Sequence, residues 1–62
     1  MEELIFVAED APEGGFTAHA LGESIFTEAE DMNGLRKNVL DAVRCHWAEP
    51  AARPRIVRVH IS

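Results

Sequence analysis

The sequence predicts a small α+β protein of order β-β-β-α-β, with one helix on one face of a four-stranded sheet. Three observations predict this fold class. Three short apolar segments separated by turn residues fill the first half of the chain, an amphipathic segment follows, and a segment of alternating polarity comes last. A chain of 62 residues has room for a single domain, residues 1–62, with one small core.

The first strand is expected over residues 3–9, where Leu4-Ile5-Phe6-Val7-Ala8 is apolar throughout. Because side chains alternate along a strand, Leu4, Phe6 and Ala8 lie on one face and Ile5 and Val7 on the other. A strand that is apolar on both faces is typical of a sheet interior covered on both sides. One helix covers one face only, so the sequence predicts that a second chain covers Ile5 and Val7.

Two further strands are expected as an antiparallel meander. A turn cluster over residues 10–15 ends in Gly14-Gly15, a pair that can adopt the positive φ angles of a hairpin loop. The second strand is expected over residues 16–21 and the third over residues 24–28, with Gly22-Glu23 as the turn between them.

The amphipathic segment predicts a helix that begins after Asp31 and is ended by Pro50. Asp31 is a good N-cap because its carboxylate accepts hydrogen bonds from the first free amides. Gly34, in the first turn, costs about 1 kcal/mol relative to alanine. The side chains expected to face the core recur at helical spacing: Met32, Leu35, Val39, Val43 and Trp47, with Leu40 and Ala42 widening the stripe.

The last strand is expected over residues 55–61, where apolar and polar side chains alternate. Val57 and Val59 share one face, and Arg58 and His60 share the other. This alternation indicates that one face of the strand is exposed to solvent and that the strand lies at the edge of the sheet. A right-handed helical crossover returns this strand parallel to the first, so the predicted strand order is 3-2-1-4.

Composition excludes several classes of function. Six basic against eleven acidic residues give a formal net charge of −5, which argues against direct binding of DNA or RNA. No apolar run is long enough to span a membrane, and Met1-Glu2-Glu3 lacks the positive flank of a secretory signal. The single cysteine, Cys45, excludes an intramolecular disulfide and, together with the missing export signal, indicates the cytoplasm.

No residue pattern identifies a reaction, a metal site or a cofactor site. Cys45 and His46 are adjacent on the predicted helix and point about 100° apart, and no zinc-ligand spacing occurs. His19, His46 and His60 are interpreted as ordinary sheet and helix residues, and Cys45 as a plain free thiol without a neighbouring base. The carboxylates fall mainly in turns and at the helix start, where no motif fixes their geometry.

Residues 14–18 read Gly-Gly-Phe-Thr-Ala, and residues 31–43 follow as the helical segment. In these two segments the chain resembles the HicB-like antitoxin family. The family has a Gly-Gly-aromatic segment after its first strand and a helix of the form Thr-x-x-Glu-Ala-x-x-Asn-x-x-x-Ala. The resemblance implies a β-β-β-α-β core, often described as a partial ribonuclease H fold.

The match to this family pattern is uneven along the chain. Asn38 and Ala42 match the helical motif, whereas Asp31 and Gly34 stand where threonine and glutamate are usual. Residues 20–25 keep only the glycine of the family's Pro-x-x-x-Gly-Cys segment. Since the sequence stops directly after the fourth strand, we expect no DNA-binding tail and carry over no operator binding.

The resemblance implies a non-enzymatic protein-binding module without a cofactor. It would self-associate as a dimer or higher oligomer and neutralise a small basic HicA-type ribonuclease. We expect apolar strand residues to form the oligomer interface: Ile5, Val7, Val57 and Val59. We expect acidic residues to make weak contacts with a basic partner: Glu9, Asp10, Glu13 and Glu23.

Two alternative functions stay open. The first is a solitary HicB-like domain that forms homo-oligomers and has a regulatory or structural role without a toxin. The second is a degenerate ribonuclease H-like nuclease, which would need clustered carboxylates that bind magnesium.

Overall fold

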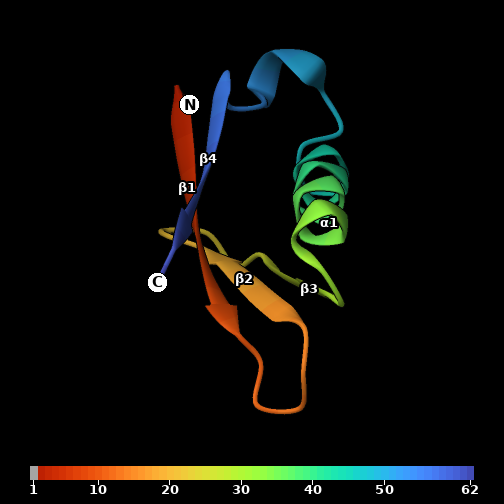
Figure 1. Ribbon diagram of the computed structural model, residues 1–62. Coiled ribbons are helices and arrows are strands. Elements are labelled where there is room, and N and C mark those ends of the chain that lie inside the picture. Colours follow the sequence, from red (N-terminus) through yellow and green to blue (C-terminus); the bar gives the residue numbers. More distant parts are fainter. Residues whose placement is uncertain (1) are drawn as a thin grey trace.

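A computed structural model describes residues 2–62 and contains every predicted element in the predicted order (Figure 1). The elements are β1 (Glu3–Asp10), β2 (Phe16–Ala20), β3 (Phe26–Ala29), α1 (Met32–His46), a short 3₁₀ helix η1 (Pro50–Ala52) and β4 (Ile56–Ile61). They form one sheet of order β3-β2-β1-β4, in which β1 is antiparallel to β2 and parallel to β4. The predicted α+β fold and its 3-2-1-4 strand order are confirmed.

The apolar run of β1 lies inside the sheet and faces two different environments. Leu4, Phe6 and Ala8 are buried in the core with the helix, whereas Ile5 and Val7 point to the opposite face and are half-buried. Burying a side chain such as Phe6 contributes about 1.5–3 kcal/mol, so the helix side of the sheet supplies the core of the domain.

The helix begins where the sequence predicts. Asp31 has an extended backbone, and its carboxylate accepts a hydrogen bond of 2.6 Å from the Gly34 amide. Leu35, Val39 and Val43 are buried, as the helical spacing predicts. The expected widening of this stripe is only partly correct: Ala42 packs against the core, but Leu40 is 49% exposed.

The helix ends at His46, earlier than the predicted stop at Pro50. Trp47 is the C-cap, with an extended backbone and an amide that donates to the Val43 carbonyl at 3.0 Å. The Arg53 guanidinium donates to the Trp47 carbonyl at 2.7 Å, which satisfies a backbone acceptor at this end of the helix. Pro50 instead begins η1.

The third strand starts two residues later than predicted, at Phe26 rather than residue 24. The Ala20 amide still donates to the Ile25 carbonyl at 3.0 Å, but the paired residues of β2 and β3 begin at His19 and Phe26, so residues 24 and 25 form the connection before the strand. The strand then extends to Ala29, and its first residue, Phe26, is exposed.

The position of α1 over the sheet is uneven and decides which surfaces stay open. The helix packs against β3 and β2, and the Asn38 amide donates to the Glu28 carbonyl of β3 at 2.9 Å. This attachment holds α1 toward one side of the sheet and leaves the inner side of β4 only partly covered. Within residues 2–62, α1 is too short and too polar to cross a membrane.

Candidate protein-binding surfaces

The face of the sheet opposite α1, here called the open face, is not covered by any element within residues 2–62 (Figure 1). Strand alternation and the register of the sheet place side chains from all four strands on it. They are Glu3, Ile5, Val7, Glu9, Thr17, His19, Leu21, Phe26, Glu28, Ile56, Arg58 and His60.

The middle of the open face carries four apolar side chains, here called the apolar belt: Ile5, Val7, Leu21 and Phe26. Val7 lies between His19 and His60 on the neighbouring strands, and Phe26 is next to His19 on β3. Beside this row, Leu21 lies next to Ile5, and the Leu21 amide donates a hydrogen bond to the Ile5 carbonyl at 2.9 Å. Phe26 and Leu21 are 63% and 51% exposed, which is unusual for residues of this size on a small domain.

The belt borders a shallow hollow of about 410 Å³ lined by Ile5, Val7 and Leu21 together with side chains of β4. Contiguous exposed apolar surface of this kind marks a protein interface in soluble proteins. The open face is therefore a candidate protein-binding surface.

One end of the open face is acidic. Glu9 pairs with Thr17, and Thr17 pairs with Glu28, so two carboxylates flank a threonine in a row across β1, β2 and β3. Both glutamates are exposed. Next to the apolar belt, this row favours a partner that combines apolar and basic side chains.

The four acidic residues expected to contact a partner do not lie together. Glu9 is on the open face, but Asp10 pairs with Phe16 on the helix side, and Glu13 is in the β1–β2 turn. Glu23 lies 3.3 Å from the His46 imidazole near the helix end. Strand alternation and the β2–β3 register bring Glu28, which the expected set omitted, next to Glu9 across the sheet.

The four residues expected at the oligomer interface are divided between two surfaces. Ile5 and Val7 lie on the open face. Val57 and Val59 pair in parallel register with the buried Leu4 and Phe6, so their side chains point to the helix side of the sheet. They are half-buried and border a different surface.

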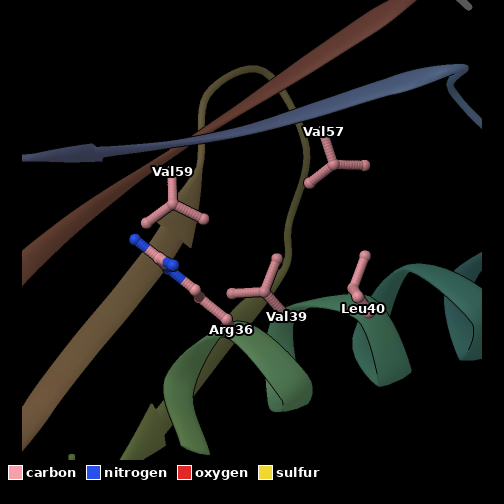
Figure 2. Close-up of a pocket in the computed structure, with 5 residues that line it drawn as sticks. All are labelled: Arg36, Val39, Leu40, Val57 and Val59. Atoms are coloured by element: carbon pink, nitrogen blue, oxygen red, sulfur yellow. The ribbon is translucent and has the colours of Figure 1, made fainter. Parts of the chain in front are cut away.

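This second surface is a groove of about 290 Å³ between α1 and β4, shown in Figure 2. Val57 and Val59 form its β4 wall, and Val39, Leu40 and Arg36 form its helix wall. In Figure 2 the Arg36 side chain reaches from the helix toward Val59, and Leu40 lies near Val57. The groove exists because α1 is attached to β3 and does not extend over β4.

The histidines and the cysteine of the described residues lie apart from one another, except where they are neighbours in the chain. Within residues 2–62, no three His, Cys, Asp or Glu side chains lie close enough to hold one metal ion. Cys45 is exposed, and the His46 ring contacts the Trp47 ring edge-on at 4.5 Å between centroids. His19 and His60 both lie on the open face, one on each side of Val7.

Comparison with known proteins places the chain in a family. A "UPF0150 protein" of Archaeoglobus fulgidus is 43% identical over 56 residues, which cover 90% of this chain and 82% of the relative. A "UPF0150 protein" of Thermotoga maritima is 33% identical over 52 residues, which cover 84% of this chain and 74% of the relative. No family model matches the chain, and no solved structure matches it significantly. On the extent and identity of these matches, the chain belongs to the UPF0150 family.

Proposed function

We propose that this chain is a non-enzymatic protein-binding module of the HicB-like antitoxin type, which self-associates and neutralises a small basic ribonuclease of the HicA type. The observation that carries the proposal is the open face, an exposed apolar belt with carboxylates at one end. The Gly-Gly-aromatic segment and the helical motif residues Asn38 and Ala42 support the HicB-like assignment.

The apolar belt supplies the affinity in this proposal. Phe26 lies on β3, and Leu21 directly follows β2 and donates its amide to the Ile5 carbonyl, so little backbone ordering opposes binding. Large aromatic side chains at the centre of an interface commonly contribute most of the binding energy. Covering Phe26 fully would contribute about 1.5–3 kcal/mol from apolar burial alone.

The acidic row supplies the preference for a basic partner. Glu9 and Glu28 lie on the same face as the belt, and the whole chain carries a formal net charge of −5. Complementary charge speeds association and makes it sensitive to salt. An acidic protein seated on a basic ribonuclease also competes with RNA phosphates for the same cations, which is a physical route to inhibition.

The matched motif residue Asn38 supports the open face indirectly. Its amide holds α1 against the Glu28 carbonyl, and β3 carries both Phe26 and Glu28 on its exposed side. In this arrangement Asn38 positions the strand that presents the binding residues, without contacting the partner itself.

The first test is the gene next to this one, which we expect to encode a short basic protein. Binding of that protein to this chain is then measured by calorimetry, with RNA cleavage by that protein as the second readout. We expect binding at micromolar concentration or tighter and loss of cleavage on addition of this chain. Phe26→Ser should weaken binding at least tenfold, since the belt loses its largest side chain.

Leu40→Ser is the matched control, because Leu40 is also a large exposed apolar residue but lies in the groove. It should leave the affinity for the basic protein unchanged. No binding at micromolar concentration would refute the antitoxin role and leave the solitary HicB-like domain. A partner that is lost with Leu40→Ser but not with Phe26→Ser would move the binding site to the groove.

A further inference from the structure

We propose that β4 is a self-pairing edge, at which two copies join their β4 strands antiparallel about a twofold axis at Val59. The product is one continuous eight-stranded sheet with both helices on the same side. The inference rests on the self-association in the proposed function and specifies the surface that carries it.

The backbone N–H and C=O groups of β4 point alternately toward β1 and toward the free edge of the sheet. The amides of Ile56 and Ser62 donate to the carbonyls of Glu2 and Ala8, at 3.0 and 2.9 Å, along the side that faces β1. Alternate residues of a strand direct their backbone groups to opposite sides. Val57, Val59 and Ile61 therefore present their N–H and C=O groups to the free edge.

These three outward residues define the register of a symmetric pair. An antiparallel ladder needs outward residues opposite each other, and a twofold axis at Val59 places Val59 opposite Val59 of the second copy. Val57 then lies opposite Ile61 of the second copy, and Ile61 opposite its Val57. Each hydrogen-bonded pair exchanges two bonds, so the three pairs form about six backbone hydrogen bonds. A shift of this axis along β4 moves at least one outward residue past the end of the strand.

The side chains agree with this register on both faces. On the helix side, all three pairs match one β-branched side chain with another, a combination that stabilises neighbouring strands. On the open face, Arg58 lies opposite His60 of the second copy. Arg58 is already paired with Glu3, and a neutral imidazole can accept a hydrogen bond from a guanidinium.

The groove favours a second copy as the occupant. Ile61, at the end of β4, is 60% exposed. The groove on the same side of β4 is lined by Val57, Val59 and Leu40 and is open to solvent. Joining the two edges makes the two grooves continuous, so each copy extends the apolar layer of the other. A stable interface buries about 800 Å² per partner, roughly a fifth of the 4369 Å² surface of this chain. Edge pairing alone is narrow, and the groove supplies the additional apolar area.

The opposite edge of the sheet is less suited to pairing. β3 has four residues against six in β4, so it offers fewer outward backbone groups for pairing. The β4 strand contains neither lysine nor proline, the residues that most often protect an edge from pairing.

Cysteine cross-linking tests the edge and its register, in a Cys45→Ser background because Cys45 is exposed. In the proposed register the two Cα atoms at position 59 lie about 5.5 Å apart, within the range of a disulfide. We expect Val59→Cys to form a covalent dimer on mild oxidation. Val57→Cys alone should not, because the two copies of this position are about 14 Å apart.

Mixing Val57→Cys with Ile61→Cys should give a covalent heterodimer. If Val59→Cys does not fold, a mixture of Arg58→Cys with His60→Cys tests the same register at two exposed positions. Circular dichroism checks that each variant is folded. Light scattering should give twice the 6.9 kDa mass of the chain for the reduced protein.

The outcomes separate this inference from the proposed function. A dimer by light scattering whose Val59→Cys variant stays unlinked would overturn the β4 edge and leave self-association to another surface. Equal cross-linking by Val57→Cys alone would overturn the register. A chain that stays at 6.9 kDa at every concentration would refute self-association altogether, while the calorimetry with Phe26→Ser still reads partner binding separately.

Discussion

Gly14 and Gly15 share one turn and both have positive φ, yet they are needed for different reasons. Gly14 has a φ of +103° with open space where a Cβ would be, so only its backbone conformation requires glycine. Gly15 has a φ of +81°, and a Cβ there would lie 2.6 Å from the Ala29 carbonyl oxygen of β3. The turn therefore packs against the sheet through Gly15.

Alanine substitutions should separate these two effects. Gly14→Ala should lower the free energy of unfolding by about 1–2 kcal/mol through backbone strain alone. Gly15→Ala should cost about 2–4 kcal/mol, because the backbone of β3 must also move. Urea unfolding followed by circular dichroism measures both. Equal losses would show that the close approach to Ala29 has no energetic effect.

The Gly-Gly pair in the sequence predicted the turn. It did not predict that Gly14 needs only a positive φ whereas Gly15 also needs the absence of a Cβ. Positive φ follows from local chain geometry, which the residue types reveal. The contact with Ala29 depends on where β3 lies, and no local pattern carries that information. The same limit applies to Glu28, whose place beside Glu9 depends on the register of two strand pairs.

At the scale of elements, core packing and one side-chain hydrogen bond together hold the helix against the sheet. The Asn38 amide donates to the Glu28 carbonyl at 2.9 Å and joins α1 to β3. Ala42, one turn further along, packs against the core, where a larger side chain would separate the helix from the sheet. Both residues match the HicB-like helical pattern, and both act at the helix–sheet contact.

Substitutions of Asn38 should destabilise the chain in a defined order. Asn38→Ala should lower the free energy of unfolding by about 1 kcal/mol through loss of the hydrogen bond. Asn38→Asp should cost about 1–3 kcal/mol, because a carboxylate cannot donate and would face the Glu28 carbonyl. Chemical denaturation measures both, with faster amide exchange in β3 as a second readout.

Lys37→Ala is the control for Asn38, since Lys37 is exposed on the same helix and its loss should change stability by no more than about 0.5 kcal/mol. An Asn38→Asp protein as stable as the unsubstituted chain would show that the bond to β3 does not hold the helix.

Element boundaries were the least accurate part of the prediction, for identifiable reasons. Asp31 was correctly predicted as the N-cap because capping is a local interaction. The helix end was placed at Pro50 instead of His46, because Arg53 reaches back from the following loop to bind the Trp47 carbonyl. A contact across six residues is not encoded in the helical pattern itself.

At the scale of the whole molecule, the sequence predicted the fold because the apolar run of β1 required an interior strand. The strand order then followed from the handedness of the crossover. The lateral position of α1 could not be predicted, since periodicity defines which face of a helix is buried but not which strands it covers. The register of β4 with β1 could not be predicted either, since alternation groups Val57 with Val59 but does not say which face of the sheet they take. Val57 and Val59 are therefore expected on one interface with Ile5 and Val7, whereas the structure places the two pairs on opposite faces.

Self-association predicts a melting temperature that depends on protein concentration. Over a hundredfold increase in concentration, the melting temperature should rise by roughly 5–10 °C, because dimer formation draws the folded chain away from the unfolding equilibrium. Thermal unfolding by circular dichroism at the two concentrations measures this shift.

Val59→Pro provides a matched control for this effect. Proline removes an outward amide and leaves the bonds between β4 and β1 in place, which an edge strand tolerates. Its melting temperature should not change with concentration. A shift of the same size in both proteins would assign the effect to a surface other than the β4 edge.

The parallel pairing of β1 with β4 also constrains the time course of folding. Glu3 pairs with Ile56, so β1 cannot complete its pairing in the sheet until β4 has been synthesised. Until residues 56–61 leave the ribosome, β1 has only β2 beside it, and the β4 wall of the groove is missing. Hydrophobic side chains of an unfinished chain therefore stay accessible to chaperones and proteases until synthesis of β4 is complete. We expect a product that lacks β4 to expose these side chains and to be cleaved faster by proteases than the chain that contains β4.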